Sequence, residues 1–123
     1  MKYLFLLNNS AEQWDEWRSL SRAERHERRE ESLPRWNDLF GWMSEQGIDV
    51  SGLELEDPAN ARVVRVQDGE TLVTDGPFAE TKEVLGGFYL IDVPNLDDAL
   101  EFAAAVPAAR RGGSVEVRPL VER

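Results

Sequence analysis

The first residues of the chain have the hydrophobic pattern of a β-strand. Large apolar side chains fill five consecutive positions: Tyr3, Leu4, Phe5, Leu6 and Leu7. Because successive side chains of a strand point to opposite faces, this strand is apolar on both. Residues 84–93 form a second apolar run of the same kind. The pattern predicts two strands that are buried on two sides at the centre of a sheet.

Helical spacing follows the first strand. Apolar residues recur at every third position: Trp14, Trp17 and Leu20. The mostly charged segment 22–35 comes next, and Ser21 with Glu24 has the spacing of a capping box at its start. Its charges are expected to be surface ion pairs, each worth only a few tenths of a kcal/mol. A proline at position 34 is expected to break or kink this helix, with Ser32 capping a second piece.

Beyond the proline, one apolar helical face is expected from four residues: Leu33, Trp36, Phe40 and Met43. Gly47 is placed to end this helix. A shorter helix is expected from a cap at Asn95 through Val106, with Pro107 ending it. Further strands are expected at residues 48–56, 61–67, 70–74 and 114–121, with Asp68-Gly69 as a hairpin turn between two of them.

The order of elements is β-α-β, then a β-hairpin, then β-α-β. It predicts an α+β fold in a single domain over residues 1–123: a ferredoxin-like antiparallel sheet with two helices on one face and an extra β-hairpin. Two helices cover only one face of such a sheet, yet its central strands are apolar on both. We therefore expect a second copy of the chain to cover the other face, giving a homodimer.

Charge and composition narrow the function classes. The 123 residues carry a net charge of −10, which disfavours nucleic acids and anionic membrane surfaces as partners. There is no cysteine and one histidine, so we expect no thiolate or multi-histidine metal site within one chain, and no cofactor fingerprint is present. The apolar run at the start is too short for a secretion signal, so a cytoplasmic location is expected.

One stretch carries a specific family signature. Residues 73–83, Val-Thr-Asp-Gly-Pro-Phe-Ala-Glu-Thr-Lys-Glu, resemble that of the DGPF-domain proteins of the YCII-related family, and the match extends over 85–93 and 113–119. The resemblance implies a dimeric α+β barrel. It also implies a regulatory association, because some DGPF-type proteins are encoded beside bacterial extracytoplasmic-function sigma factors. A His–Asp pair proposed for the wider group is not carried over, because His26 lies in a charged helical run without a matching motif.

The signature loop is the candidate site. Asp75 is a candidate general base or hydrogen-bond acceptor, Gly76 admits a close backbone approach and Phe78 offers an apolar wall. The structural alternative is a turn in which Asp75 accepts backbone N–H groups. Further candidate ligand residues follow directly: Glu80, Thr81 and Lys82. For these the alternative is a solvated loop, or a salt bridge that fixes the loop across the dimer.

A pair of glycines, Gly86-Gly87, interrupts the apolar run 84–93. Glycine inside a strand marks a bulge or a close approach of a ligand, and the bulge is the favoured interpretation. Two functions remain open. One is a homodimeric small-molecule-binding or regulatory module, and the other is a small enzyme with Asp75 and Glu80 in acid/base roles. The loop is expected to border the most enclosed pocket.

Overall fold

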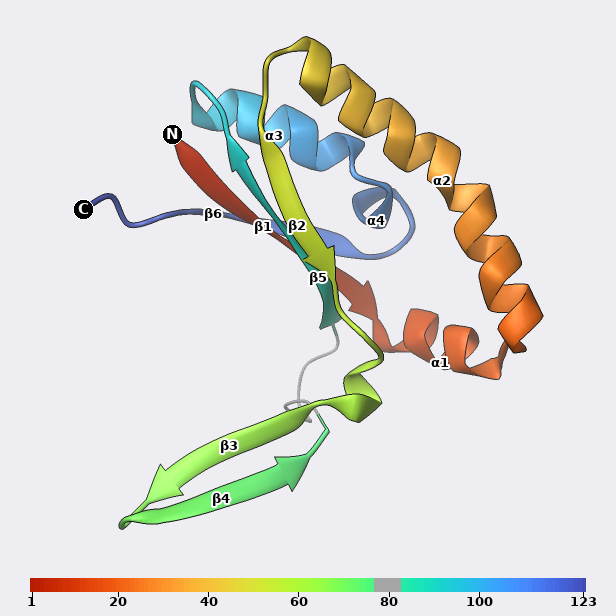
Figure 1. The fold of residues 1–123 in the computed structure, drawn as a ribbon, viewed down its shortest axis with the longest axis vertical. Helices are drawn as coiled ribbons and strands as arrows, with labels where there is room; N and C mark the ends of the chain where they lie inside the picture. The colour runs from red at the N-terminus through yellow and green to blue at the C-terminus, as the bar shows by residue number, and fades with distance from the viewer. Residues whose placement is uncertain (77–82) are drawn as a thin grey trace.

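The computed structural model of the chain describes residues 1–76 and 83–123 (Figure 1). The strands are β1 (Lys2–Ser10), β2 (Val50–Glu54), β3 (Arg62–Gln67), β4 (Glu70–Asp75), β5 (Glu83–Asp92) and β6 (Ser114–Pro119). The helices are α1 (Ala11–Ser19), α2 (Arg22–Glu45), the 3₁₀ turn η1 (Pro58–Asn60), α3 (Leu96–Ala105) and α4 (Pro107–Arg110). Every strand predicted from the hydrophobic pattern is present, with its ends shifted by at most a few residues.

Four strands form one antiparallel sheet in the order β2-β5-β1-β6. This is the ferredoxin-like α+β arrangement predicted above, with β3 and β4 paired separately as the extra hairpin. Helices α2 and α3 lie on one face of the sheet (Figure 1). The sheet is open and does not close into a barrel, so the expected barrel would need the sheet of a second copy.

The core lies between that face and the helices. Tyr3, Phe5 and Leu7 of β1 point into it and are almost completely buried, as is Ile91 of β5. The remaining core residues come mainly from α2 and α3: Leu39, Met43, Val93, Ala99, Phe102, Ala103 and Val106. By contrast, Leu4 and Leu6 of β1 are only partly buried. Within one chain, the central strands are therefore buried on one face only.

Of the break or kink predicted at Pro34, the break is wrong, because α2 runs without interruption through this residue. Pro34 and Glu30 are both exposed. The carbonyl of Glu30, which the proline leaves without its helical partner, therefore faces water and is not stranded in the core. Ser32 does not cap a second helix, since its hydroxyl donates to the Arg29 carbonyl at 2.9 Å. The capping box at Ser21 is confirmed, with the Glu24 backbone N–H donating to Ser21 Oγ at 3.1 Å.

The predicted apolar face of α2 needs one correction. Trp36, Phe40 and Met43 face the sheet as expected, but Leu33 is 45% exposed, and Leu39 takes a buried position in its place. Other local signals are confirmed, including the caps at Asn95 and Gly47 and the hairpin turn at Asp68-Gly69, where both residues have positive φ. Pro107 ends α3 and starts the short helix α4.

Candidate functional site

The signature loop begins at the base of the β3–β4 hairpin. Asp75 is the last residue of β4 and lies opposite Arg62 of β3, with Arg62 Nε 3.1 Å from Asp75 Oδ1. Gly76 has a φ of +83°, a conformation that favours glycine. Its N–H donates to the Ala61 carbonyl at 2.8 Å. The first two residues of the candidate site are therefore held in place by the hairpin.

The carboxylate of Asp75 points into solvent and is 87% exposed. The other four predicted site residues lie outside the described part of the chain: Phe78, Glu80, Thr81 and Lys82. The structure therefore places Asp75 and Gly76 at the hairpin base. That the other four residues gather beside them stays a prediction. The exposed Asp75 carboxylate therefore does not lie in an enclosed position of the kind that acid–base catalysis favours.

Replacing Asp75 by asparagine is expected to leave stability nearly unchanged. Its described partner is a surface ion pair with Arg62, and such pairs contribute about 1 kcal/mol or less. Thermal unfolding followed by circular dichroism should show a shift of no more than about 4 °C. Asp92→Asn is the matched control, because Asp92 makes a similarly exposed ion pair, at 3.2 Å, with the N-terminus. A much larger drop for Asp75→Asn alone would mean that the side chain has a structural role.

The glycine pair forms a β-bulge, as predicted. The register between β1 and β5 shifts at this point, so that Leu7 pairs with Gly87 and Asn8 with Leu85. A Cβ at Gly86 would collide with the side-chain amide of Asn9. The ring of Trp14 also packs against this position, 3.4 Å from where that Cβ would lie. The bulge thus makes room for side chains of β1 and α1.

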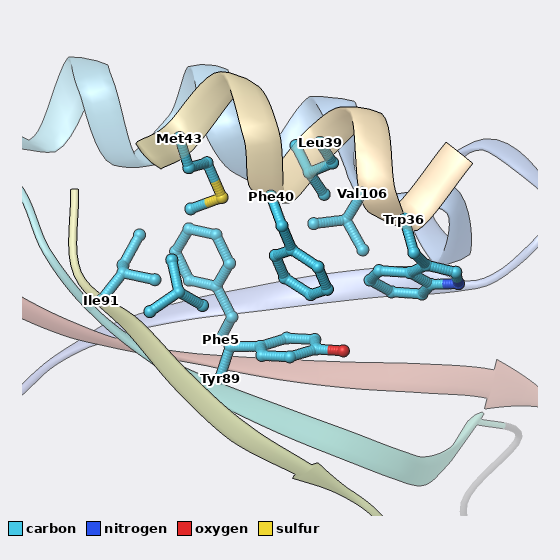
Figure 2. Close-up of a pocket in the computed structure, with 9 residues that line it drawn as sticks. Phe5, Trp36, Leu39, Phe40, Met43, Tyr89, Ile91 and Val106 are labelled. Atoms are coloured by element: carbon cyan, nitrogen blue, oxygen red, sulfur yellow. The ribbon is translucent and has the colours of Figure 1, made fainter. Parts of the chain in front are cut away.

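A small apolar space lies elsewhere, between α2 and the sheet (Figure 2). Its lining is made of nine apolar or aromatic residues: Phe5, Trp36, Leu39, Phe40, Met43, Val50, Tyr89, Ile91 and Val106. The space measures about 10 Å³, enough for about one water molecule. Neither Asp75 nor Gly76 lines it. This space is a gap in the packing of the core, and it does not have the size of a ligand site.

Three aromatic rings close one end of that space. Trp36 and Phe40 of α2 lie over Tyr89 of β5, with ring centroids 5.5–5.8 Å apart (Figure 2). Burial raises the pKa of the Tyr89 hydroxyl, and the nearby charge of Glu54 adds to the effect. The phenol is therefore held neutral beside the core. This contact was not visible in the sequence, because Tyr89 belongs to a strand distant from the helix.

Charged residues at the start of α2 tie the helices to the sheet. The Arg25 guanidinium donates to the carbonyls of Trp17 and Arg18 at 3.0 and 3.1 Å, at the end of α1. Arg29 binds both carboxylate oxygens of Glu54 at 2.8 Å and lies over the Trp17 ring. The segment predicted to be a solvated helix face therefore joins α1, α2 and β2.

A second ionic contact secures the approach to the hairpin. Arg18 of α1 holds the carboxylate of Asp57 through two nitrogens, with distances of 2.8 and 2.9 Å. This contact keeps the pKa of Asp57 below its usual value. Asp57 also accepts the Ala59 N–H at 2.9 Å and so caps η1. The chain that leads into β3 is thereby fixed to the body of the fold.

The sheet face opposite the helices is largely apolar; we call it the open face. Strand pairing aligns two rows of side chains across it: Glu116–Leu6–Phe88–Leu53 and Arg118–Leu4–Leu90–Ser51. Leu53 is 68% exposed. On β6, Glu116 and Arg118 form an ion pair of 2.6 Å. The open face thus has an apolar middle and a polar edge, the usual anatomy of a protein interface.

Within the described residues, 1–76 and 83–123, no group of three or more His, Asp and Glu side chains is arranged to hold a metal ion. No described helix combines the length and the hydrophobicity needed to cross a membrane. His26 lies on the outer face of α2, 3.8 Å from Glu30.

Comparison with known proteins gives a family-level match. A profile described as the YCII-related domain matches residues 1–123. An uncharacterized protein of Rhizobium meliloti (strain 1021) is 59% identical to this chain over 61 residues. That match covers 49% of this chain and 49% of the relative. The match therefore spans about half the length of each of the two proteins.

Proposed function

Because the chain belongs to the YCII-related domain family, we propose that it is a homodimeric small-molecule-binding module, joined through its open face. The apolar middle of that face carries the dimer part of the proposal. In one chain Leu4, Leu6, Phe88 and Leu90 are only partly buried, and Leu53 is 68% exposed. A second copy would remove these side chains from water, which is the main driving force of association. It would also supply the second sheet that a dimeric barrel needs.

Leu53→Glu is the direct test of this dimer. The side chain is largely exposed in one chain, so the substitution should not disturb folding. In a dimer it buries one carboxylate from each copy, which is expected to raise the dissociation constant by about 100-fold or more. Sedimentation at micromolar concentration should give twice the 14.0 kDa chain mass for the wild type and the single mass for the variant.

Leu100→Glu is the matched control. Leu100 lies on α3, across the molecule from the open face, and is 48% exposed. Its substitution should leave the dimer intact. A wild type that sediments at 14.0 kDa would overturn the proposal, as would equal effects of the two variants.

The ligand is proposed to bind at the loop that starts at the hairpin base, with the residues expected from the sequence: Asp75, Gly76, Phe78, Glu80, Thr81 and Lys82. Solvent exposure of Asp75 supports binding over catalysis. A carboxyl group becomes an effective acid or base near neutral pH through burial or a like charge beside it. The enzyme with Asp75 and Glu80 in acid/base roles is the alternative. A cytoplasmic location and a regulatory link to a sigma factor belong to the proposal through the family resemblance alone.

A further inference from the structure

The β3–β4 hairpin, residues 62–75, stands apart from the rest of the chain; we call it the arm. Its strands pair with each other and with no other described strand. Outside this pairing, neither strand packs extensively against another described element. Figure 1 shows the arm projecting away from the sheet. A two-stranded hairpin is at best marginally stable in water without a surface to pack on, so the arm needs a partner surface.

One face of the arm offers an apolar contact. Val64 lies opposite Val73, and Val66 lies on the same face, two residues along β3. These three valines, the valine strip, are 59%, 59% and 68% exposed. The other face is more polar, with Val63 opposite Thr74, Arg65 opposite Leu72 and Gln67 opposite Glu70. An apolar strip on one side and polar residues on the other are typical of a hairpin that covers a surface.

The base of the arm is anchored on both sides. The Gly76 N–H binds the Ala61 carbonyl, and the Arg62–Asp75 ion pair joins the two strands at the same level. Asp57, just before β3, is held by Arg18 of α1. The first two contacts close the base of the arm, and the third joins the approach to the arm to α1. In the single chain the valine strip stays largely exposed.

We propose that the arm packs through its valine strip on a second copy of the chain, each copy contributing one arm and receiving one. This inference rests on the proposed homodimer and adds the arm to its interface, beside the open face. Mutual exchange closes the assembly with two-fold symmetry, so no arm is left without a surface. The valine strip itself is apolar, and the charges on the same face, Arg62 and Asp75, are paired with each other at its base. It suits an apolar part of the second copy beside the open face, since the open face itself is covered by the sheet of that copy.

The size of the interface favours the same occupant. Strand and residue spacings give the paired part of the open face a footprint of about 300 Å² per copy. Two such faces together fall well below the total of about 1,200–2,000 Å² buried in stable complexes. One face of the arm is two strands wide and six residues long, so its contact covers about 200 Å² on the arm and about 200 Å² on the copy that receives it. With two arms, the total reaches the size of a stable dimer.

The absence of cysteine from the chain makes a clean test possible. Val66→Cys places one thiol on the valine strip, and Leu72→Cys places one on the opposite face of the arm as the matched control. Each is labelled with a maleimide at protein concentrations above and below the dissociation constant of the dimer, which sedimentation measures on the same samples. We expect labelling of Val66→Cys to be about 10-fold slower or more in the dimer, and that of Leu72→Cys to change by less than about 2-fold.

The outcomes separate the two proposals. Equal labelling of Val66→Cys at both concentrations, in samples that do dimerise, would overturn the arm contact and leave the homodimer standing. Slow labelling at every concentration would mean that the arm packs on its own chain, which also overturns the inference. A chain that stays monomeric throughout would overturn both.

Discussion

Phe5→Ala is expected to lower the melting temperature by about 10–20 °C. Phe5 is 1% exposed and is among the largest fully buried side chains of the fold. Its ring lies under α2 among Met43, Ile91 and the other residues of the core (Figure 2). Removing a buried phenylalanine ring costs about 3–5 kcal/mol, because apolar burial is lost and a cavity remains. In a domain of this size, each kcal/mol corresponds to about 3–5 °C.

The neighbouring residue supplies the control. Leu6→Ala removes an apolar side chain from the same strand but from the open face, where it is only partly buried in one chain. Thermal unfolding at low protein concentration should therefore show a much smaller loss for Leu6→Ala. If the proposed dimer forms, this loss should grow with protein concentration, whereas that of Phe5→Ala should not depend on it. Equal losses at high dilution would contradict the one-sided burial of β1.

The second large effect is expected from Gly52→Ala. Gly52 of β2 lies opposite Tyr89 of β5. A Cβ at this position would overlap the Phe88 carbonyl oxygen and the Tyr89 ring. Since the carbonyl belongs to the backbone of a central strand, β2 or the ring must move. Overpacking of this kind costs about 3 kcal/mol, which corresponds to a melting temperature lower by about 10 °C.

Gly41→Ala is the matched substitution, and it is expected to raise the melting temperature instead of lowering it. Gly41 lies inside α2, and a Cβ there would meet no atom within 4 Å. Alanine favours a helix over glycine by about 1 kcal/mol, so the melting temperature should rise by a few degrees. Both variants are measured by the same thermal unfolding experiment. An unchanged melting temperature for Gly52→Ala would mean that β2 does not approach β5 as closely as described.

Local chemistry accounts for the elements that could be predicted from the sequence. Runs of apolar residues located the two central strands, and the Asp68-Gly69 pair located the hairpin turn. The caps at Ser21 and Asn95 marked the starts of α2 and α3. Each of these signals acts between residues only a few positions apart, so a single sequence contains it completely.

The candidate site was predictable only in part. Asp75 and Gly76 do lie where a strand of the hairpin ends, as the turn chemistry indicated. The sequence did not reveal that the Asp75 carboxylate points into solvent, or that a small apolar space lies under α2. The first depends on where the hairpin stands relative to the sheet, and the second on how α2 packs against the sheet. The place of the hairpin is set by contacts such as Arg18–Asp57, between residues 39 positions apart.

By itself, the sequence determined the order of elements, the ferredoxin-like plan and the presence of an apolar surface that two helices leave uncovered. Only the tertiary structure decided how these parts meet. It showed that α2 continues through Pro34, that Leu39 and not Leu33 enters the core, and that the arm stands apart with its valines exposed. The physical reason is the range of the interactions. Periodicity and capping act within one turn or one strand, whereas burial depends on which distant surface comes to lie against each face.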